Sequence, residues 1–173
     1  MNSLIILNIQ AVMCLTAILV IYVTYLRPWF AAQPFGPAVL PGLLVHSFRF
    51  VGLTMLVNGQ IDPELPRSSI QLMAFGDLAA AVTALAAAIA VAAKSKMATP
   101  LVAVFVVVGG VDFAIAIPTG LKAGVFESYL GGMWIVIQYY VPLVLLTQIY
   151  ITYRLINHLR GYSGTAVLRR DAQ

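Results

Sequence analysis

Five apolar stretches, each long enough to cross a lipid bilayer, constrain this 173-residue chain more than any other feature. A transmembrane helix needs about 20 predominantly apolar residues. Hydrophobic residues make up 61% of the chain and charged residues 9%, against about 45–50% and about 25% in soluble domains, which excludes a soluble fold. A membrane barrel would bring more polar residues on its lumen face. The predicted spans are Ser3–Leu26, Ala38–Val57, Ser69–Ala93, Ala98–Ile117 and Tyr129–Leu155.

The sequence therefore predicts an all-α, polytopic integral membrane bundle of five transmembrane helices. Residues 1–156 form the five-helix transmembrane domain, and residues 157–173 form a basic tail. The second span is the least apolar because His46, Ser47 and Arg49 lie in its middle, so a re-entrant or tilted segment is the alternative there. The single cysteine, Cys14, excludes an internal disulfide and a thiolate metal cluster.

The basic residues outside the spans predict an orientation. With five spans, seven of them fall on one side and two on the other, and Lys and Arg concentrate in cytoplasmic loops. We expect an extracytoplasmic N-terminus, a cytoplasmic C-terminus and a multi-pass location in the cell (inner) membrane. The side predicted to be cytoplasmic carries Arg27, Lys94, Lys96, Arg154, Arg160, Arg169 and Arg170, and the other side carries Arg67 and Lys122.

Four ionisable residues lie inside predicted spans, where such residues are costly and usually face a partner or a water-filled cavity. With a rise of about 1.5 Å per residue, Arg49 and Asp77 each lie about 12 Å from the outer ends of their spans, and Asp112 about 8–12 Å. His46 lies about one turn deeper, on the same helical face as Arg49. Three separate helices therefore place charged groups at a similar depth, and we expect one polar cluster in the outer half of the bundle.

Other polar residues in the spans fall at comparable depths. The predicted ligand-binding set is His46, Arg49, Asp77, Asp112, Gln138, Tyr139 and Asn8. With His46 neutral and both acids ionised, the four ionisable groups sum to −1, so a proton, a cation or water is expected to balance the site. Gly76 lies next to Asp77, where a small residue favours close packing or leaves room beside a carboxylate.

Two prolines predict local breaks. Pro118 is expected to end the fourth span. Pro142 lies inside the fifth span and cannot donate to the carbonyl of Gln138, so a kink or loosened turn is expected there.

The leading functional hypothesis is a non-catalytic membrane protein whose outward-facing polar pocket binds or passes a small polar or proton-coupled solute. In it Arg49 holds an anionic or carbonyl group, both acids set the charge, and His46 tunes protonation. A structural or accessory subunit of a larger membrane complex, with the cluster as a buried salt bridge, is the first alternative. A membrane redox subunit that binds a quinone or haem is the second.

The cofactor is unknown, and no metal site is predicted because Arg49 would oppose a cation. The expected partners are the lipid bilayer, a small-molecule ligand, and a second copy or a membrane-complex subunit; nucleic acid is not among them.

Overall fold

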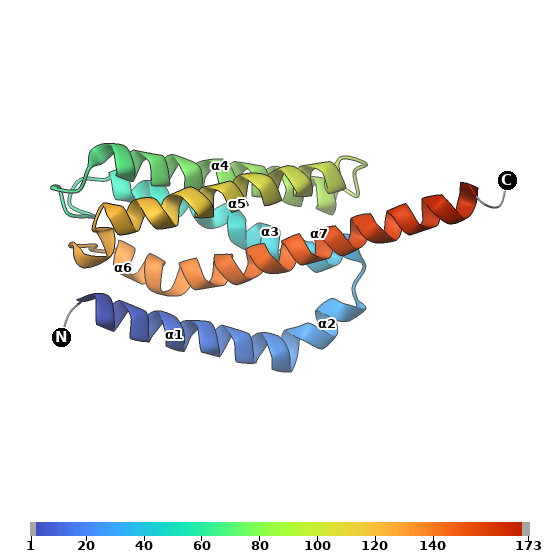
Figure 1. Cartoon of the computed structure of the whole chain (residues 1–173), viewed down its shortest axis with the longest axis horizontal. Helices are drawn as coiled ribbons and strands as arrows, with labels where there is room; N and C mark the ends of the chain where they lie inside the picture. Colours follow the sequence, from blue (N-terminus) through green and yellow to red (C-terminus); the bar gives the residue numbers. More distant parts are fainter. Residues whose placement is uncertain (1–2, 171–173) are drawn as a thin grey trace.

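The computed structural model describes the backbone of residues 3–170 and the side chains of residues 3–161. This part of the chain is helical throughout, without strands, and contains five helical segments long and apolar enough to cross a membrane (Figure 1). The elements are α1 (Ser3–Ile21), η1 (Tyr22–Leu26), α2 (Arg27–Ala32), α3 (Phe35–Ser47), η2 (Phe48–Leu56), α4 (Arg67–Ala92), α5 (Ala98–Lys122), η3 (Val125–Glu127), α6 (Met133–Ile135), η4 (Val136–Tyr140) and α7 (Val141–Arg170). Five of the described helices, α1, α2, α3, α6 and α7, continue directly from, or into, a short segment of π or 3₁₀ helix.

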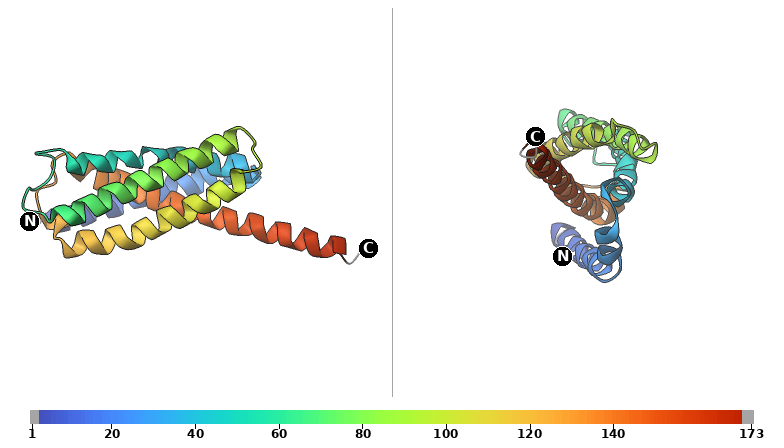
Figure 2. Two further views of the ribbon diagram at one scale, coloured as in Figure 1. Left: turned by 90° about the horizontal axis from the view of Figure 1, so that it is seen from above. Right: turned by 90° about the vertical axis from the view of Figure 1, so that its right-hand side faces the viewer.

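The five segments run up and down beside one another, and α7 continues past the other helices at one end (Figures 1 and 2). Helix α4 packs against α3, η2 and α5, and α7 packs against α3 and α5. Alanines give α4 a narrow surface, which lets its neighbours approach closely. Helix α1 lies at the side of the bundle, and Leu7 is its only buried residue. The site described below therefore forms among α4, α5, α7 and the second segment.

The two ends of the bundle differ in charge. One end holds the connection between η2 and α4 and the one between α5 and α6. We call it the acidic end because its three acidic residues, Asp62, Glu64 and Glu127, outnumber its two basic residues, Arg67 and Lys122. The opposite end holds the connections between α2 and α3 and between α4 and α5 (Figure 1). We call it the basic end because it carries Arg27, Lys94, Lys96 and Arg154.

Several helix bounds differ from those predicted. Helix α5 continues through Pro118 to Lys122, so the prediction that Pro118 ends this span is wrong. A proline removes one backbone donor, and neighbouring helices can compensate for that loss. The second span begins at Phe35, with Pro41 inside α3. Helical geometry also continues past Leu26 to Ala32 and past Leu155 to Arg170.

Both π-helical segments end two residues before a proline. The Arg27 amide donates to the Tyr22 carbonyl before Pro28, and the Val141 amide donates to the Val136 carbonyl before Pro142. Because proline has no N–H, the preceding turn loses its usual bond and widens to the i→i−5 pattern. The loosened turn expected at Pro142 is therefore present.

The second span changes winding at its middle. After Ser47, the α-helix continues as the nine-residue 3₁₀ segment η2. Runs of 3₁₀ helix longer than three or four residues are uncommon, and inside a helix they often mark a functional or strained segment. Arg49 lies on this segment, so a locally unusual backbone presents the arginine of the candidate site.

Candidate functional site

One arginine joins three helical segments at the centre of the candidate site. Arg49 of η2 donates from Nε to Asp77 Oδ1 of α4 over 2.8 Å, and its Nη2 lies 2.8 Å from the same oxygen. Nη2 also donates to Asp112 Oδ2 of α5. The structure thus brings together three of the residues that the sequence placed at a common depth. We call Arg49, Asp77 and Asp112 the ion cluster.

The ion cluster is shielded from solvent, but unevenly. The side chains of Arg49 and Asp112 are 2% and 7% exposed, whereas that of Asp77 is 28% exposed. The ring of Phe113 covers the guanidinium, with its centroid 4.4 Å from Cζ, and this cation–π contact stabilises the charge. Two carboxylates share one guanidinium, so the ionised cluster carries a charge of −1. A buried imbalance of this kind calls for a proton or a cation.

Two glycines make room for the carboxylates. A Cβ at Gly76 would overlap the carboxylate of Asp112, and a Cβ at Gly52 would overlap that of Asp77. Gly110 differs, because a Cβ there would meet nothing within 4 Å. Gly76 and Gly52 therefore let each carboxylate reach Arg49 across the backbone of a neighbouring segment.

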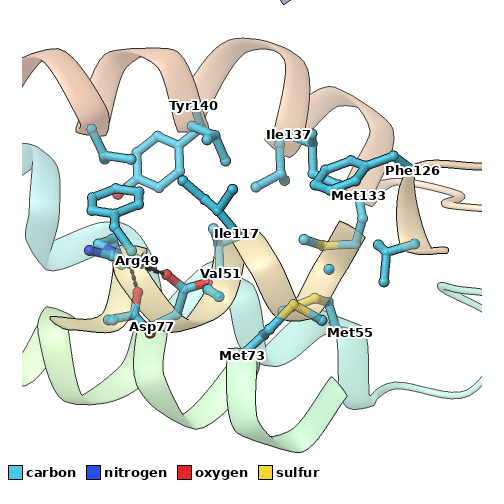
Figure 3. Close-up of a pocket in the computed structure, with 18 residues that line it drawn as sticks. Arg49, Val51, Met55, Met73, Asp77, Ile117, Phe126, Met133, Ile137 and Tyr140 are labelled. Carbon is cyan, nitrogen blue, oxygen red and sulfur yellow. Dashed lines mark hydrogen bonds and ion pairs between the residues drawn. The ribbon is translucent and has the colours of Figure 1, made fainter. Parts of the chain in front are cut away.

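A pocket of about 110 Å³ extends from the ion cluster towards the acidic end (Figure 3). Arg49 and Asp77 lie at one end of this pocket, and Met55, Met73 and Met133 lie at the other. The walls between them are aliphatic and aromatic. A space of this size holds several water molecules or a small organic molecule. We call it the cluster pocket.

Tyr140 forms the wall of the pocket beside the ion cluster (Figure 3). Its hydroxyl donates to the carbonyl of Val45 over 2.6 Å. That bond joins η4 to α3 near the point where the second span changes to 3₁₀ winding, so the tyrosine both lines the pocket and fixes two helices together.

His46 lies apart from the ion cluster contacts. Its ring is fully buried, Nε2 lies 3.1 Å from the Thr147 hydroxyl of α7, and the Phe105 ring packs edge-on with centroids 4.8 Å apart. Despite their i,i+3 spacing, His46 and Arg49 contact different groups: His46 contacts Thr147 and Phe105, whereas Arg49 contacts both carboxylates of the ion cluster and Phe113.

The remaining predicted residues lie outside the ion cluster. Gln138 is buried on η4, and Tyr139 is 55% exposed on the outside of the bundle. Asn8 is exposed on α1 and lines a separate apolar groove between α1 and α7. Four residues of the predicted ligand-binding set therefore do not line the cluster pocket: Asn8, His46, Gln138 and Tyr139.

Sequence reasoning missed two polar residues of α7 near the site. Thr147 contacts His46, and Gln148 is buried with its Nε2 donating to the Val106 carbonyl over 3.1 Å. Gln148 Oε1 is buried without a hydrogen-bond partner and would lie 2.8 Å from a Cβ at Gly109. An amide side chain inside an apolar span was the available signal for Gln148.

The described residues contain no group of three or more His, Cys, Asp or Glu side chains arranged to hold a metal ion. The groups that the site offers to a ligand are thus two carboxylates, the guanidinium that they share, and apolar side chains in the walls.

Comparison with known protein families assigns the chain to one of them. Residues 6–156 match the family described as a domain of unknown function, DUF8737, and the chain belongs to that family. No curated protein and no solved structure matches the chain.

Proposed function

We propose that this DUF8737 member binds and passes a small solute with a cationic head and an apolar body, in exchange for a proton. The observation that carries the proposal is the ion cluster: two carboxylates share one arginine at the end of a pocket, leaving one negative charge unbalanced.

The charge imbalance supports proton coupling. An unbalanced carboxylate in a low-dielectric site binds a proton or a cation, because an isolated buried charge is costly. The single unbalanced negative charge is neutralised by either a proton or a cation, and not by both at once. Entry of a cationic head beside Asp77 or Asp112 would therefore release a proton, and its departure would allow one to rebind.

The walls of the cluster pocket support an apolar body on the solute. Met55, Met73 and Met133 are flexible and polarisable, so they adapt to ligands of different shape. Arg49 has a different role from the one expected from the sequence. Nε and Nη2 bind the protein's own carboxylates, so Arg49 holds the acids in place, and its Nη1 is buried without a hydrogen-bond partner.

The charge of the two ends supports an orientation in the cell (inner) membrane with the basic end in the cytoplasm. In that orientation the cluster pocket extends towards the extracytoplasmic side. Asp77 lies ten residues from the start of α4, or about 15 Å along the helix, which places the ion cluster in the outer half.

Calorimetric titration of the purified protein in detergent tests the binding. The probes are n-butylammonium and n-butanol, which share an apolar chain and differ in the charge of the head. We expect n-butylammonium to bind at least about tenfold more tightly, and a pH-sensitive dye in weak buffer to report one released proton. In proteoliposomes, an outward n-butylammonium gradient should move protons in the opposite direction.

Two variants of matched chemistry sharpen the test. Asp77→Asn removes a carboxylate of the ion cluster and should abolish both the charge preference and the proton release. Glu127→Gln removes an exposed carboxylate at the acidic end and should change neither. Circular dichroism checks that both variants fold. Equal affinity for the two probes, or an equal loss in both variants, would contradict the proposal.

The second candidate is a structural role, in which the ion cluster clamps three spans of an accessory subunit. The near-complete burial of Arg49 against two carboxylates favours it. In that case Asp77→Asn and Asp112→Asn would lower the unfolding temperature without any ligand effect, and the protein would copurify with a stoichiometric partner.

A further inference from the structure

A second cavity, of about 540 Å³, opens at the basic end between α2 and α7. Its walls come from η1, α2, the start of α3 and residues 150–158 of α7. Unlike the cluster pocket, it is lined by two arginines and no acidic residue. We call it the basic groove.

Arg154 is fixed in one wall of the basic groove. Its Nη1 donates to the Phe30 carbonyl over 2.8 Å, and its Nη2 donates to the Gln33 carbonyl over 2.7 Å. Both acceptors are neutral, so they orient the half-buried guanidinium without balancing its charge. A pre-oriented guanidinium loses little side-chain entropy when it binds an anion.

Arg27 supplies a second positive charge from the opposite wall, where the π-helical segment η1 gives way to α2. Tyr153 and Asn157 add a hydroxyl and an amide from α7. Two guanidinium groups that line one groove together with neutral donors suit the oxygens of a phosphate, which guanidinium binds in a planar, two-bond arrangement.

Aromatic rings surround the charged part of the groove. The Phe30 and Tyr150 ring centroids lie 5.1 Å apart, the Tyr22 and Tyr150 centroids 6.1 Å, and Trp29 packs on Phe30 at 4.9 Å. Aromatic belts of this kind are typical of the boundary between hydrocarbon and headgroups. Helix α1 continues from this boundary with a surface of exposed aliphatic side chains, along which acyl chains can lie.

We propose that the basic groove binds a phosphate-bearing anion, and that its source is the headgroup of an anionic glycerophospholipid. Arg154 and Arg27 bind the phosphate oxygens, Tyr153 and Asn157 donate to the remaining headgroup oxygens, and the acyl chains lie against α1. This site is separate from the cluster pocket and does not depend on the function proposed for that pocket.

Native mass spectrometry of the delipidated full chain tests the proposal. The additions are phosphatidylglycerol, phosphatidylcholine with the same acyl chains, and inorganic phosphate. We expect one phosphatidylglycerol to be retained in preference to phosphatidylcholine. Arg27→Gln should weaken retention of phosphatidylglycerol about tenfold, because it removes one charge-assisted contact, and the Arg27 side chain makes no hydrogen bond or ion pair within the described residues.

Lys96→Gln is the matched control, since it removes one positive charge at the same end but outside the groove. It should leave retention unchanged. Thermal stabilisation by inorganic phosphate that Arg27→Gln abolishes would support the anion site and identify free phosphate as a sufficient ligand. Equal retention of the two lipids, or an equal loss in Arg27→Gln and Lys96→Gln, would overturn the proposal.

Discussion

A single added methyl group at Gly76 should break one of the two ion pairs of the ion cluster. A Cβ at this position lies 3.0 Å from Asp112 Cγ and overlaps the nearer carboxylate oxygen. In Gly76→Ala, the Asp112 carboxylate must therefore rotate away from Arg49, or α4 and α5 must separate. Either movement removes the ion pair between Arg49 and Asp112.

The size of the effect follows from opposing contributions. Breaking a buried ion pair costs about 3–5 kcal/mol, and the lower part of this range applies because Arg49 keeps Asp77. Alanine in place of glycine in a helix recovers about 1 kcal/mol. We therefore expect Gly76→Ala to lower the free energy of unfolding by about 2 kcal/mol.

Gly110→Ala is the matched control. Gly110 is also helical and lies two residues before Asp112, but a Cβ there meets nothing within 4 Å. Only the gain in helix propensity remains, so this variant should be neutral or more stable by up to about 1 kcal/mol.

Unfolding in mild detergent, driven by added dodecyl sulfate and followed by circular dichroism, measures both variants. A double variant isolates the cause. In the Asp112→Ala background, where the carboxylate is absent, Gly76→Ala should no longer lower the free energy of unfolding. Equal stability of Gly76→Ala and Gly110→Ala in the otherwise native chain would refute the placement of Asp112 against Gly76.

Two smaller predictions concern the helices around the ion cluster and use the same unfolding measurement. Thr147→Val leaves the buried His46 Nε2 without its partner and should cost about 1–3 kcal/mol, whereas Thr152→Val removes only a bond within its own helix and should cost less. Tyr140→Phe removes the 2.6 Å bond to the Val45 carbonyl and should cost about 1 kcal/mol; no change would show that this bond does not tie η4 to α3.

Hydropathy predicted the number of helices because an apolar run of about 20 residues is a strong signal. Depth arithmetic then indicated that Arg49, Asp77 and Asp112 lie at one level, and the structure places them in contact. Which acid binds Arg49 was not predictable, because helix order does not follow from periodicity. The structure shows that both acids do.

A hydrophobic pattern with a period of 3.6 residues does not predict how the π and 3₁₀ segments turn their side chains. The π segment η4 inserts an extra residue into a turn, which shifts the inward face by about a quarter of a turn. Tyr139 points outward while Tyr140 lines the pocket, as adjacent residues of a helix lie about 100° apart around its axis. The change to 3₁₀ helix after Ser47 stacks residues three apart above one another, which a 3.6-residue pattern does not anticipate.

The 3₁₀ winding of η2 also sets how far the second span reaches. At about 1.5 Å per α-helical residue and about 2.0 Å per 3₁₀ residue, α3 and η2 together extend roughly 38 Å, close to the roughly 39 Å of α4. A chain segment of 22 residues thereby matches the length of its 26-residue neighbour. Rewinding η2 as α-helix would shorten the segment by about 4–5 Å and turn its two ends by about half a revolution relative to each other. Arg49 is the second residue of η2, so it stays close to the point where the winding changes, and the residues that follow it carry most of the added length.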